Sequence, residues 1–386
     1  MRRDRLRPLA LNAGPVPLKD AYDVAVIGGG IVGLCLGWRL AERGMSVVVL
    51  DHGEPGAAAS GANAGTLALQ NKRSPQLAFY REAIEEWRRL AATLGPDAVG
   101  YQRPGGLHVA TSVAEAATLR AIATAHERAG TALAWLEGSA LRAHAPWLGP
   151  AVPAATWLAD DAYANPLLVG PALVRIARAA GAEILGHAPV ESVTCGHDGY
   201  GLQTPLGLIR CRIAAIAAGA WSERVGALFS LRLPIRSSVI VLSVSEPSPP
   251  YLPSIITHVG GRLTVKQVPN GTTLIGGGWP GRGSLATGAL HIQAGMLRHN
   301  LAFAASVVPR LAQRRLTRSW AGFEIETPDS LPIAGALDRR KTVFAAVPAA
   351  AGFSAGPLLA RLVADAILDG EMPELGRQLD PGRFER

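Results

Sequence analysis

Near its N-terminus the chain carries apolar runs separated by a glycine-rich turn. Tyr22 to Ile27 is a short β-branched, apolar run followed by three consecutive glycines, which predicts a buried parallel strand. Ile31 to Arg43 predicts a helix that Gly44 closes, and Ser46 to Leu50 predicts a second buried strand. Strand, glycine turn, helix and strand in this order form a βαβ unit, the building block of a parallel sheet.

Beyond this unit the pattern alternates between helical and strand periodicity. Apolar residues at helical spacing, with Arg and Glu between them, predict an amphipathic helix over Pro75 to Leu94. Between Ser230 and Thr287, runs rich in Val, Ile and Thr are separated by Pro and Gly clusters, which predicts an antiparallel sheet. The other predicted helices cover residues 114–129, 166–180, 289–308 and 356–369. The other predicted strands cover residues 107–111, 132–136, 183–185, 213–218 and 342–346.

The turn of the βαβ unit spells a dinucleotide-binding motif. Gly28, Gly30 and Gly33 form G-x-G-x-x-G between a predicted strand and a predicted helix. The first glycine allows a tight turn, the second lets the backbone approach a pyrophosphate, and the third lets the helix pack closely on the strand. Asp51 ends the second strand, where a carboxylate accepts hydrogen bonds from ribose hydroxyls. The complete context therefore predicts a dinucleotide site.

A second G-x-G-x-x-G occurs at Gly276, Gly278 and Gly281. Pro280 lies inside it, no helix is predicted to begin directly after it, and Arg298 and His299 stand where the acid should be. We therefore interpret it as a strand end and turn. With a single nucleotide-binding unit, the chain is not expected to bind a separate nicotinamide.

Composition excludes several classes of protein. The 386 residues are 48% hydrophobic and 18% charged, which is typical of a globular enzyme, and no apolar run reaches the roughly 18 residues of a membrane span. The formal charge of +8 comes from dispersed arginines without clustered aromatics, so we expect no nucleic acid as partner. Cys35, Cys195 and Cys211 are odd in number and lack paired spacing, which argues against disulfides or a metal site and favours the reducing cytoplasm.

The first twenty residues are basic. Arg2 and Arg3 could be read as a twin-arginine export signal, and Arg5 and Arg7 follow them. Proline and glycine between Pro8 and Pro17 interrupt any apolar signal core, which favours a disordered basic tail.

Further motifs support a resemblance to a known family. The segments are Asp23 to Gly37, Ser60 to Gly65, Ala217 to Ser222, Thr327 to Asp329 and Gly352 to Gly356. In this order, across residues 21 to 370, they resemble the D-amino-acid oxidase superfamily of FAD-dependent oxidoreductases. The resemblance implies FAD as the cofactor and oxidation of a C–N bond as the reaction.

The resemblance also implies which residues hold FAD. The Asn63 segment would pass by the flavin, and the turn that starts at Gly352 would point a helix N-terminus at its N1/C2 carbonyl edge, where a helix end stabilises negative charge by about 0.3–2 kcal/mol. No cysteine follows Cys211, and His52 stands outside the Asn63 segment, so we expect non-covalent FAD. The predicted FAD-binding residues are Gly28, Gly30, Ile31, Val32, Gly33, Asp51, His52, Ser60, Asn63, Ala64, Gly65, Thr66, Leu67, Val190, Ala218, Gly219, Trp221, Gly322, Gly352, Phe353, Ser354 and Ala355.

The expected fold class is α/β, with a Rossmann-type FAD-binding domain interleaved with a smaller α+β substrate domain on an antiparallel sheet. The FAD-binding domain is expected to take residues 21–95, 150–228 and 319–372, and the substrate domain residues 96–149 and 229–318. Residues 1–20 and 373–386 are expected to be tails.

At the substrate end the sequence departs from its relatives. Many relatives carry an arginine two residues after a W-x-G motif, where this chain has Glu324. That change removes the usual clamp for a substrate carboxylate and leaves a group that could meet a cation, face solvent or pair with Arg318. The candidate replacement anchors for the carboxylate are Arg103, Lys266 and Gln267. A solvated surface charge is an equally valid interpretation of each of these three.

Within the superfamily, Ser60 to Thr66, Tyr101 to Val109 and Gly322 to Gly335 look similar to β subunits of heteromeric dehydrogenases. These include opine (octopine and nopaline) oxidases, D-hydroxyproline dehydrogenase and hydrogen cyanide synthase. The resemblance implies a secondary amine or D-amino acid as substrate and partner subunits that take the electrons. A stand-alone glycine or D-amino-acid oxidase using O₂, and a non-catalytic flavin-binding subunit, stay open as alternatives.

Overall fold

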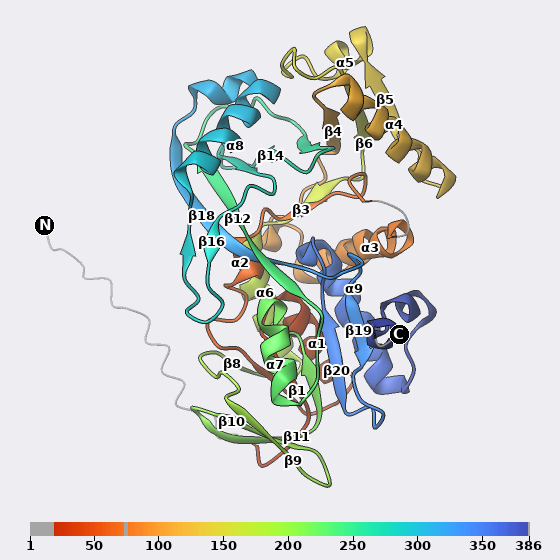
Figure 1. The fold of residues 1–386 in the computed structure, drawn as a ribbon, viewed down its shortest axis with the longest axis vertical. Helices are drawn as coiled ribbons and strands as arrows, with labels where there is room; N and C mark the ends of the chain where they lie inside the picture. The colour runs from red at the N-terminus through yellow and green to blue at the C-terminus, as the bar shows by residue number, and fades with distance from the viewer. Residues whose placement is uncertain (1–18, 73–75, 385–386) are drawn as a thin grey trace, which may run out of the picture.

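The computed structural model of the chain describes residues 19–72 and 76–384. Two large sheets form its frame, the mainly parallel one in the lower half of Figure 1 and the mainly antiparallel one in the upper half. This arrangement confirms the predicted α/β class. The predicted basic tail falls almost wholly outside the described residues. Across the described ranges, no helix has the length and apolarity to cross a membrane.

The parallel sheet contains the predicted βαβ unit. Across the sheet its strands are β19 (Ile333–Ala336), β20 (Val343–Val347), β11 (Gly207–Ile216), β1 (Tyr22–Ile27), β2 (Val47–Leu50) and β8 (Glu183–Leu185). β1 lies parallel to both β2 and β11, so its backbone is hydrogen-bonded on both sides. The hairpin of β9 (Ser192–Cys195) and β10 (Tyr200–Thr204) continues from β11.

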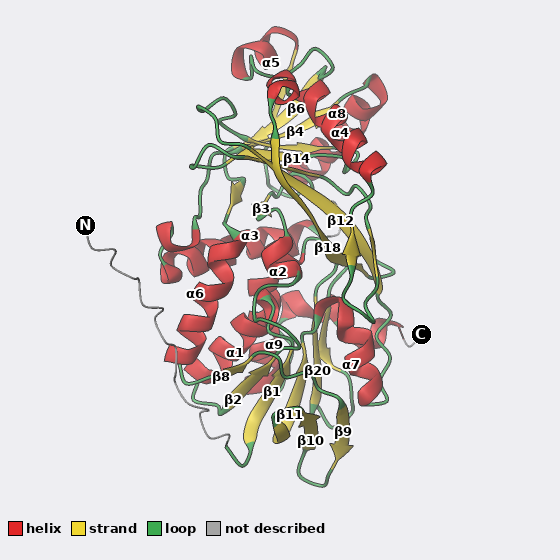
Figure 2. Cartoon of the chain, turned by 90° about the vertical axis from the view of Figure 1, so that its left-hand side faces the viewer, coloured by secondary structure: helices red, strands yellow, loops and turns green. Residues whose placement is uncertain are grey.

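A layer of helices covers one face of this sheet, as Figure 2 shows. The helices are α1 (Ile31–Glu42), α3 (Leu77–Leu94), α6 (Pro166–Ala179) and α9 (Gly352–Asp369). Nearly every residue of α1 is buried, because α6 and α9 flank it while the sheet lies beneath it. Gly33 brings α1 onto the sheet, since a Cβ there would clash with the carbonyl oxygen of Gly28. A Cβ on Gly37 would lie 2.5 Å from a methyl of Val49.

The second sheet is antiparallel except where β4 and β13 pair in parallel. Its strands, in order, are β18 (Leu316–Glu326), β12 (Arg236–Ser245), β15 (Thr273–Gly276), β14 (Thr264–Gln267), β13 (Ile255–His258), β4 (Gly106–Ala110), β6 (Ala154–Leu158) and β5 (Ala134–Glu137). The helices around it are α4 (Val113–Arg128), α5 (Gly138–His144) and α8 (Ala294–Val307). An apolar cluster that includes Leu107, Val265 and Val307 holds α8 and α5 to it.

Strand pairing modifies the predicted division of the chain. β6 pairs with β4 and β5, and β18 pairs along most of its length with β12, so both strands belong to the second sheet. The sequence places them with the nucleotide-binding part, because the chain alone does not show which strand a run will pair with. The predicted tail after residue 372 also packs: two 3₁₀ helices, Glu374–Leu379 and Pro381–Phe384, lie against β19, with Leu379 fully buried. The domain limits themselves stay a prediction.

Short elements join the two sheets. They are α2 (Ala59–Ala62), β3 (Thr66–Leu67) with its partner β7 (Ala162–Tyr163), α7 (Ser222–Leu228), and the hairpin of β16 (Arg282–Gly283) and β17 (Leu290–His291). The second glycine motif is a strand end and turn, as predicted, because β15 ends at Gly276 and no helix begins before Ala294.

Candidate functional site: a cavity between the two sheets

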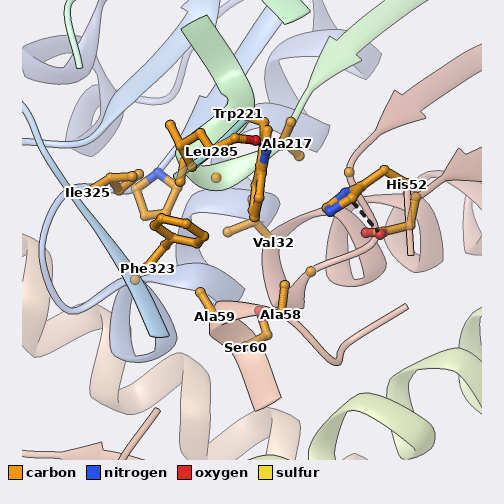
Figure 3. Close-up of a pocket in the computed structure, with 18 of the residues that line it drawn as sticks. Val32, His52, Ala58, Ala59, Ser60, Ala217, Trp221, Leu285, Phe323 and Ile325 are labelled. Atoms are coloured by element: carbon orange, nitrogen blue, oxygen red, sulfur yellow. Dashed lines mark hydrogen bonds and ion pairs between the residues drawn. The ribbon is translucent and has the colours of Figure 1, made fainter. Parts of the chain in front are cut away.

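A cavity of about 510 Å³ opens at the carboxyl ends of β1, β2 and β11. Open parallel sheets bind ligands at this edge, and pockets for small molecules and cofactors usually measure about 300–1,000 Å³. Figure 3 shows side chains from both sheets around the cavity, with Val32 and His52 from the βαβ unit and Phe323 from β18. The predicted FAD-binding residues that line it are Gly28, Gly30, Ile31, Val32, Asp51, His52, Ser60, Asn63, Val190, Ala218, Gly219, Trp221, Gly322, Gly352 and Phe353.

The glycine turn forms one end of the cavity. Gly28 has φ +114°, and a Cβ there would clash with the carbonyl of Ala217, so this position requires glycine. Gly30 has an ordinary φ of −73°, and a Cβ there would meet only the Ser60 hydroxyl, at 3.0 Å. The same hydroxyl accepts a hydrogen bond from the Ile31 N–H at 2.8 Å. The backbone at Gly30 is therefore bare toward the cavity, beside the positive end of α1.

Asp51 lies at the end of β2 and is only 8% exposed. Its carboxylate accepts hydrogen bonds from the N–H groups of Gly29, at 2.7 Å, and Gly53, at 2.8 Å. The neighbouring His52 ring lies 4.6 Å from the Trp221 ring, and both line the cavity. Asp51 therefore fixes the glycine turn and still presents carboxylate oxygens to the cavity.

The Asn63 segment is held by its own side chain. The Asn63 amide donates to the Ser60 carbonyl at 2.7 Å and accepts from the Gly65 N–H at 2.6 Å. Of the predicted FAD-binding residues, seven lie outside the cavity lining and support it instead: Gly33, Ala64, Gly65, Thr66, Leu67, Ser354 and Ala355. Leu67 and Ala355, for example, have no exposed surface and pack in the core, and the Ser354 hydroxyl donates to the Thr66 carbonyl at 3.1 Å.

The other end of the cavity is built by β18 and by the turn before α9. Gly322 lets β18 approach α2, since a Cβ there would lie 3.2 Å from the Ala62 methyl, and the Trp320 indole donates to the Ala62 carbonyl at 2.7 Å. Ala351 has a left-handed φ of +66° and precedes the first residue of α9, Gly352. The N-terminus of a long helix therefore faces the cavity, as the sequence predicts.

Glu324 lines this end of the cavity. Burial raises the pKa of Glu324, and the negative charge of Glu326 raises it further; the Ala351 N–H and the Lys72 ammonium oppose them. Of the alternatives that the sequence left open, an ion pair with Arg318 is absent: within 4.0 Å the described residues give Glu324 no ion pair. A half-buried carboxyl thus stands where relatives carry an arginine.

The three predicted carboxylate anchors have different surroundings. Lys266 is 3% exposed, and its ammonium donates to the Ala64 carbonyl and to the Thr66 hydroxyl. Burial lowers the pKa of Lys266 to about 7.

The other two anchors are corrected by the structure. Gln267 accepts from the Tyr251 N–H at 2.8 Å and donates to the carbonyl of Ser248 at 3.1 Å, because alternation along β14 turns it away from Lys266 and onto the loop before β13. Arg103 is exposed and paired with Asp160, outside the cavity lining. Neither side chain is available to a ligand in the cavity.

Sequence reasoning missed part of the lining. The missed positions include Gly56, Ala58, Ala59, Ala188, Pro189, Arg224, Leu285, Ala286, Thr287, Gly288, Pro348, Ala349 and Ala351. Residues 285–288 belong to the β16–β17 hairpin of the second sheet, and the Trp221 indole donates to the Leu285 carbonyl at 3.0 Å. The sequence carries no local signal for such a contact, because it arises only when the two sheets come together.

Comparison with known proteins agrees with this geometry. Residues 23–366 match the DAO family of FAD-dependent oxidoreductases. Glycine oxidase from Geobacillus kaustophilus is 28% identical over 358 residues, covering 90% of this chain and 93% of that protein. An opine oxidase subunit from Rhizobium meliloti is 26% identical over 332 residues, covering 83% and 87%.

Solved structures show the same fold. The crystal structure of the Geobacillus kaustophilus glycine oxidase superposes with a TM-score of 0.85 at 26% identity, over 94% of this chain and 99% of that one. L-proline dehydrogenase from P. horikoshii superposes with a TM-score of 0.86 at 23% identity, over 96% and 99%. The chain belongs to the DAO family, and it is a FAD-dependent oxidoreductase.

The cavity fits FAD. The bare backbone at Gly30 and the N-terminus of α1 suit a pyrophosphate, and the Asp51 carboxylate suits ribose hydroxyls. At the other end, the N-terminus of α9 suits the edge of a flavin where negative charge gathers on reduction. When bound, FAD supplies an acceptor for two electrons. All three cysteines of the chain lie outside the cavity lining, in keeping with the prediction of non-covalent attachment.

Proposed function

We propose that the protein oxidises the C–N bond of an N-substituted or D-amino acid, such as an opine or D-hydroxyproline, by hydride transfer from the substrate carbon to flavin N5. Water then splits the resulting imine. This chemistry requires a neutral amine held close to the flavin more than it requires a protein acid or base. The family match and the relatives that are named as a glycine oxidase and as part of an opine oxidase support it.

The observation that carries the choice of substrate is Glu324. A buried carboxylate without a cationic partner costs several kcal/mol or becomes protonated, so its place in the cavity calls for a positive group nearby. A guanidinium, as in an opine derived from arginine, would satisfy it in bidentate fashion. Glu324 therefore favours a substrate with a second cationic group over a plain D-amino acid.

We further propose that the chain is the catalytic β subunit of a heteromeric dehydrogenase and acts in the cytoplasm. The relative named as one subunit of an opine oxidase supports the first point, and three free cysteines are compatible with a reducing compartment. The second candidate is a stand-alone oxidase that uses O₂, which the glycine oxidase relatives favour at slightly higher identity.

Purification from the native cells separates these candidates. Co-purifying subunits with dye-linked activity and no peroxide are expected for the heteromeric dehydrogenase. A yellow homo-oligomer that forms peroxide from glycine would instead establish the oxidase. A flavin that no amino acid or opine reduces would leave only a non-catalytic flavin-binding subunit.

A further inference from the structure

Three side chains from separate parts of the chain gather at the turn before α9. The Tyr80 hydroxyl, from α3, donates to the Ala350 carbonyl at 2.9 Å. The N–H of the next residue, Ala351, holds the Glu324 carboxyl. The Lys72 ammonium lies 4.5 Å from the centre of the Tyr80 ring. A cation, an aromatic hydroxyl and a carboxyl thus share one end of the cavity.

The backbone of Lys72 is fixed on both sides. Its N–H donates to the Leu69 carbonyl at 2.9 Å, and its carbonyl accepts from the buried His126 ring at 2.9 Å. The side chain is half-buried, yet its ammonium forms no hydrogen bond and no ion pair within 4.0 Å with any residue in the ranges 19–72 and 76–384. A rigidly placed cation is therefore left with its donors unspent.

The other basic groups near the cavity are less suited to an anion. Lys266 spends two donors on Ala64 and Thr66, and burial lowers the pKa of Lys266 to about 7. Arg103 is paired with Asp160 at the surface. Lys72 is the cation whose charge reaches Glu324, and the distance between their charged atoms exceeds 4.0 Å.

We propose that Lys72 binds the carboxylate of the substrate and replaces the arginine clamp that this chain lacks. The inference rests on the proposed oxidation of an amino acid and adds the residue that recognises its carboxylate. Lys72 and Glu324 together then select a substrate that carries both a carboxylate and a second cationic group. Lys72 is a specificity-determining residue here, since it contacts the substrate away from the bond that is oxidised.

The test measures binding of acetate, a bare carboxylate, to the FAD-loaded protein. Acetate is titrated at pH 6.5 into the wild type and into the K72M, K72R and E324Q variants, with K341M as control because Lys341 is exposed and donates to Gly370. Binding is followed by the change in flavin absorption and, independently, by the rise in Tm. K72M is expected to raise the Kd at least tenfold, while K72R and K341M stay within threefold of the wild type.

The pH dependence separates a carboxylate site from a purely structural lysine. Burial lowers the pKa of Lys72 to about 8, so acetate binding to the wild type should weaken as pH rises from 7 to 9. The groups that face Lys72 are Glu324, Asp161, Tyr80 and His126. Burial raises the pKa of Asp161 only to about 6, places that of Tyr80 above its usual range and lowers that of His126, so none of these three titrates between pH 7 and 9. The pH step should persist in E324Q and vanish in K72R.

Each result decides the matter. Acetate binding that K72M leaves unchanged, no acetate binding to the wild type, or a pH step that survives in K72R would overturn the role of Lys72. If K72M does not fold, K72R and the wild-type pH step still decide. Anaerobic reduction of the wild type by octopine is measured alongside: lysine-dependent acetate binding in a flavin that no amino acid or opine reduces would refute the proposed function and leave the carboxylate site standing.

Discussion

The Asp51 carboxylate accepts a hydrogen bond from the Gly29 N–H at 2.7 Å, which ties the end of β2 to the glycine turn after β1. Asp51→Ala is expected to weaken FAD binding by about 1.5–3 kcal/mol, the usual value for a hydrogen bond to a charged group, or roughly 10- to 150-fold in Kd. Titration of the apoprotein with FAD measures this. Asp51→Asn keeps an oxygen for Gly29 and should lose less. A large loss of turnover at saturating FAD would show that Asp51 has another role.

Gly30 and Gly33 are expected to fail in different ways. Gly30→Val should fold, because its φ is ordinary and its Cβ position meets only the Ser60 hydroxyl, but its methyls would occupy the space of the pyrophosphate. The purified variant should therefore be colourless with an unchanged circular dichroism spectrum. Gly30→Ala is the matched control and should keep part of its FAD. Gly33→Ala should lose folding itself, because its Cβ would clash with the Gly28 carbonyl. Normal FAD content in Gly30→Val would place the pyrophosphate elsewhere.

FAD is expected to leave the protein intact on acid or heat denaturation. All three cysteines lie outside the cavity lining, and His52 lies beside Asp51, at the glycine-turn end rather than at the end formed by β18 and α9. After precipitation, the supernatant should contain all the flavin, identified as FAD by mass spectrometry. Flavin that stays with the precipitate would demonstrate a covalent bond.

Glu324 is expected to decide between cationic and neutral substrates. Flavin reduction by octopine, D-proline and D-alanine is compared in the wild type, Glu324→Gln and Glu324→Arg. Loss of the charge pair should lower activity on octopine at least tenfold, about 1.4 kcal/mol, and should spare or improve the neutral substrates. Equal effects on all three substrates, or none on any, would remove Glu324 from substrate recognition.

The stability of these variants tests the ionisation of Glu324. Burial raises the pKa of Glu324, so whatever stability its protonated form contributes is present at low pH and is lost as pH rises through that raised pKa. Glu324→Gln removes the cost of a buried charge, so its Tm relative to the wild type should increase between pH 4.5 and 8. A difference in Tm that does not vary with pH would mean that the pKa of Glu324 is unperturbed.

Local patterns predicted the nucleotide-binding unit well. The bounds of β1 and β8 agree with the structure, and α1 ends within one residue of its predicted end, because an apolar run and a glycine turn specify strand and helix over a few residues. The cavity end at Gly28 and Asp51 followed from the same unit, since the carboxyl ends of parallel strands meet at one edge.

The rest depended on pairing between distant segments. β6 joins the second sheet only because β4 and β5 accept it from both sides, and no pattern within the strand announces those partners. Gln267 looked as available as Lys266 until the pleat of β14 turned them to opposite sides. Lys72 was missed because its relation to Glu324 depends on Tyr80 and the turn before α9, which lie far apart in the sequence.

The central claim, oxidation of an amino-acid C–N bond by bound FAD, is tested most directly by anaerobic reduction of the flavin. The purified protein is mixed without oxygen with octopine, nopaline, D-hydroxyproline, D-proline, D-alanine and glycine, and the visible absorption of the oxidised flavin is followed. We expect at least one opine or N-substituted amino acid to bleach the flavin fully, with glycine and D-alanine slower. A flavin that none of these compounds reduces, in a protein that dithionite does reduce, would contradict the claim.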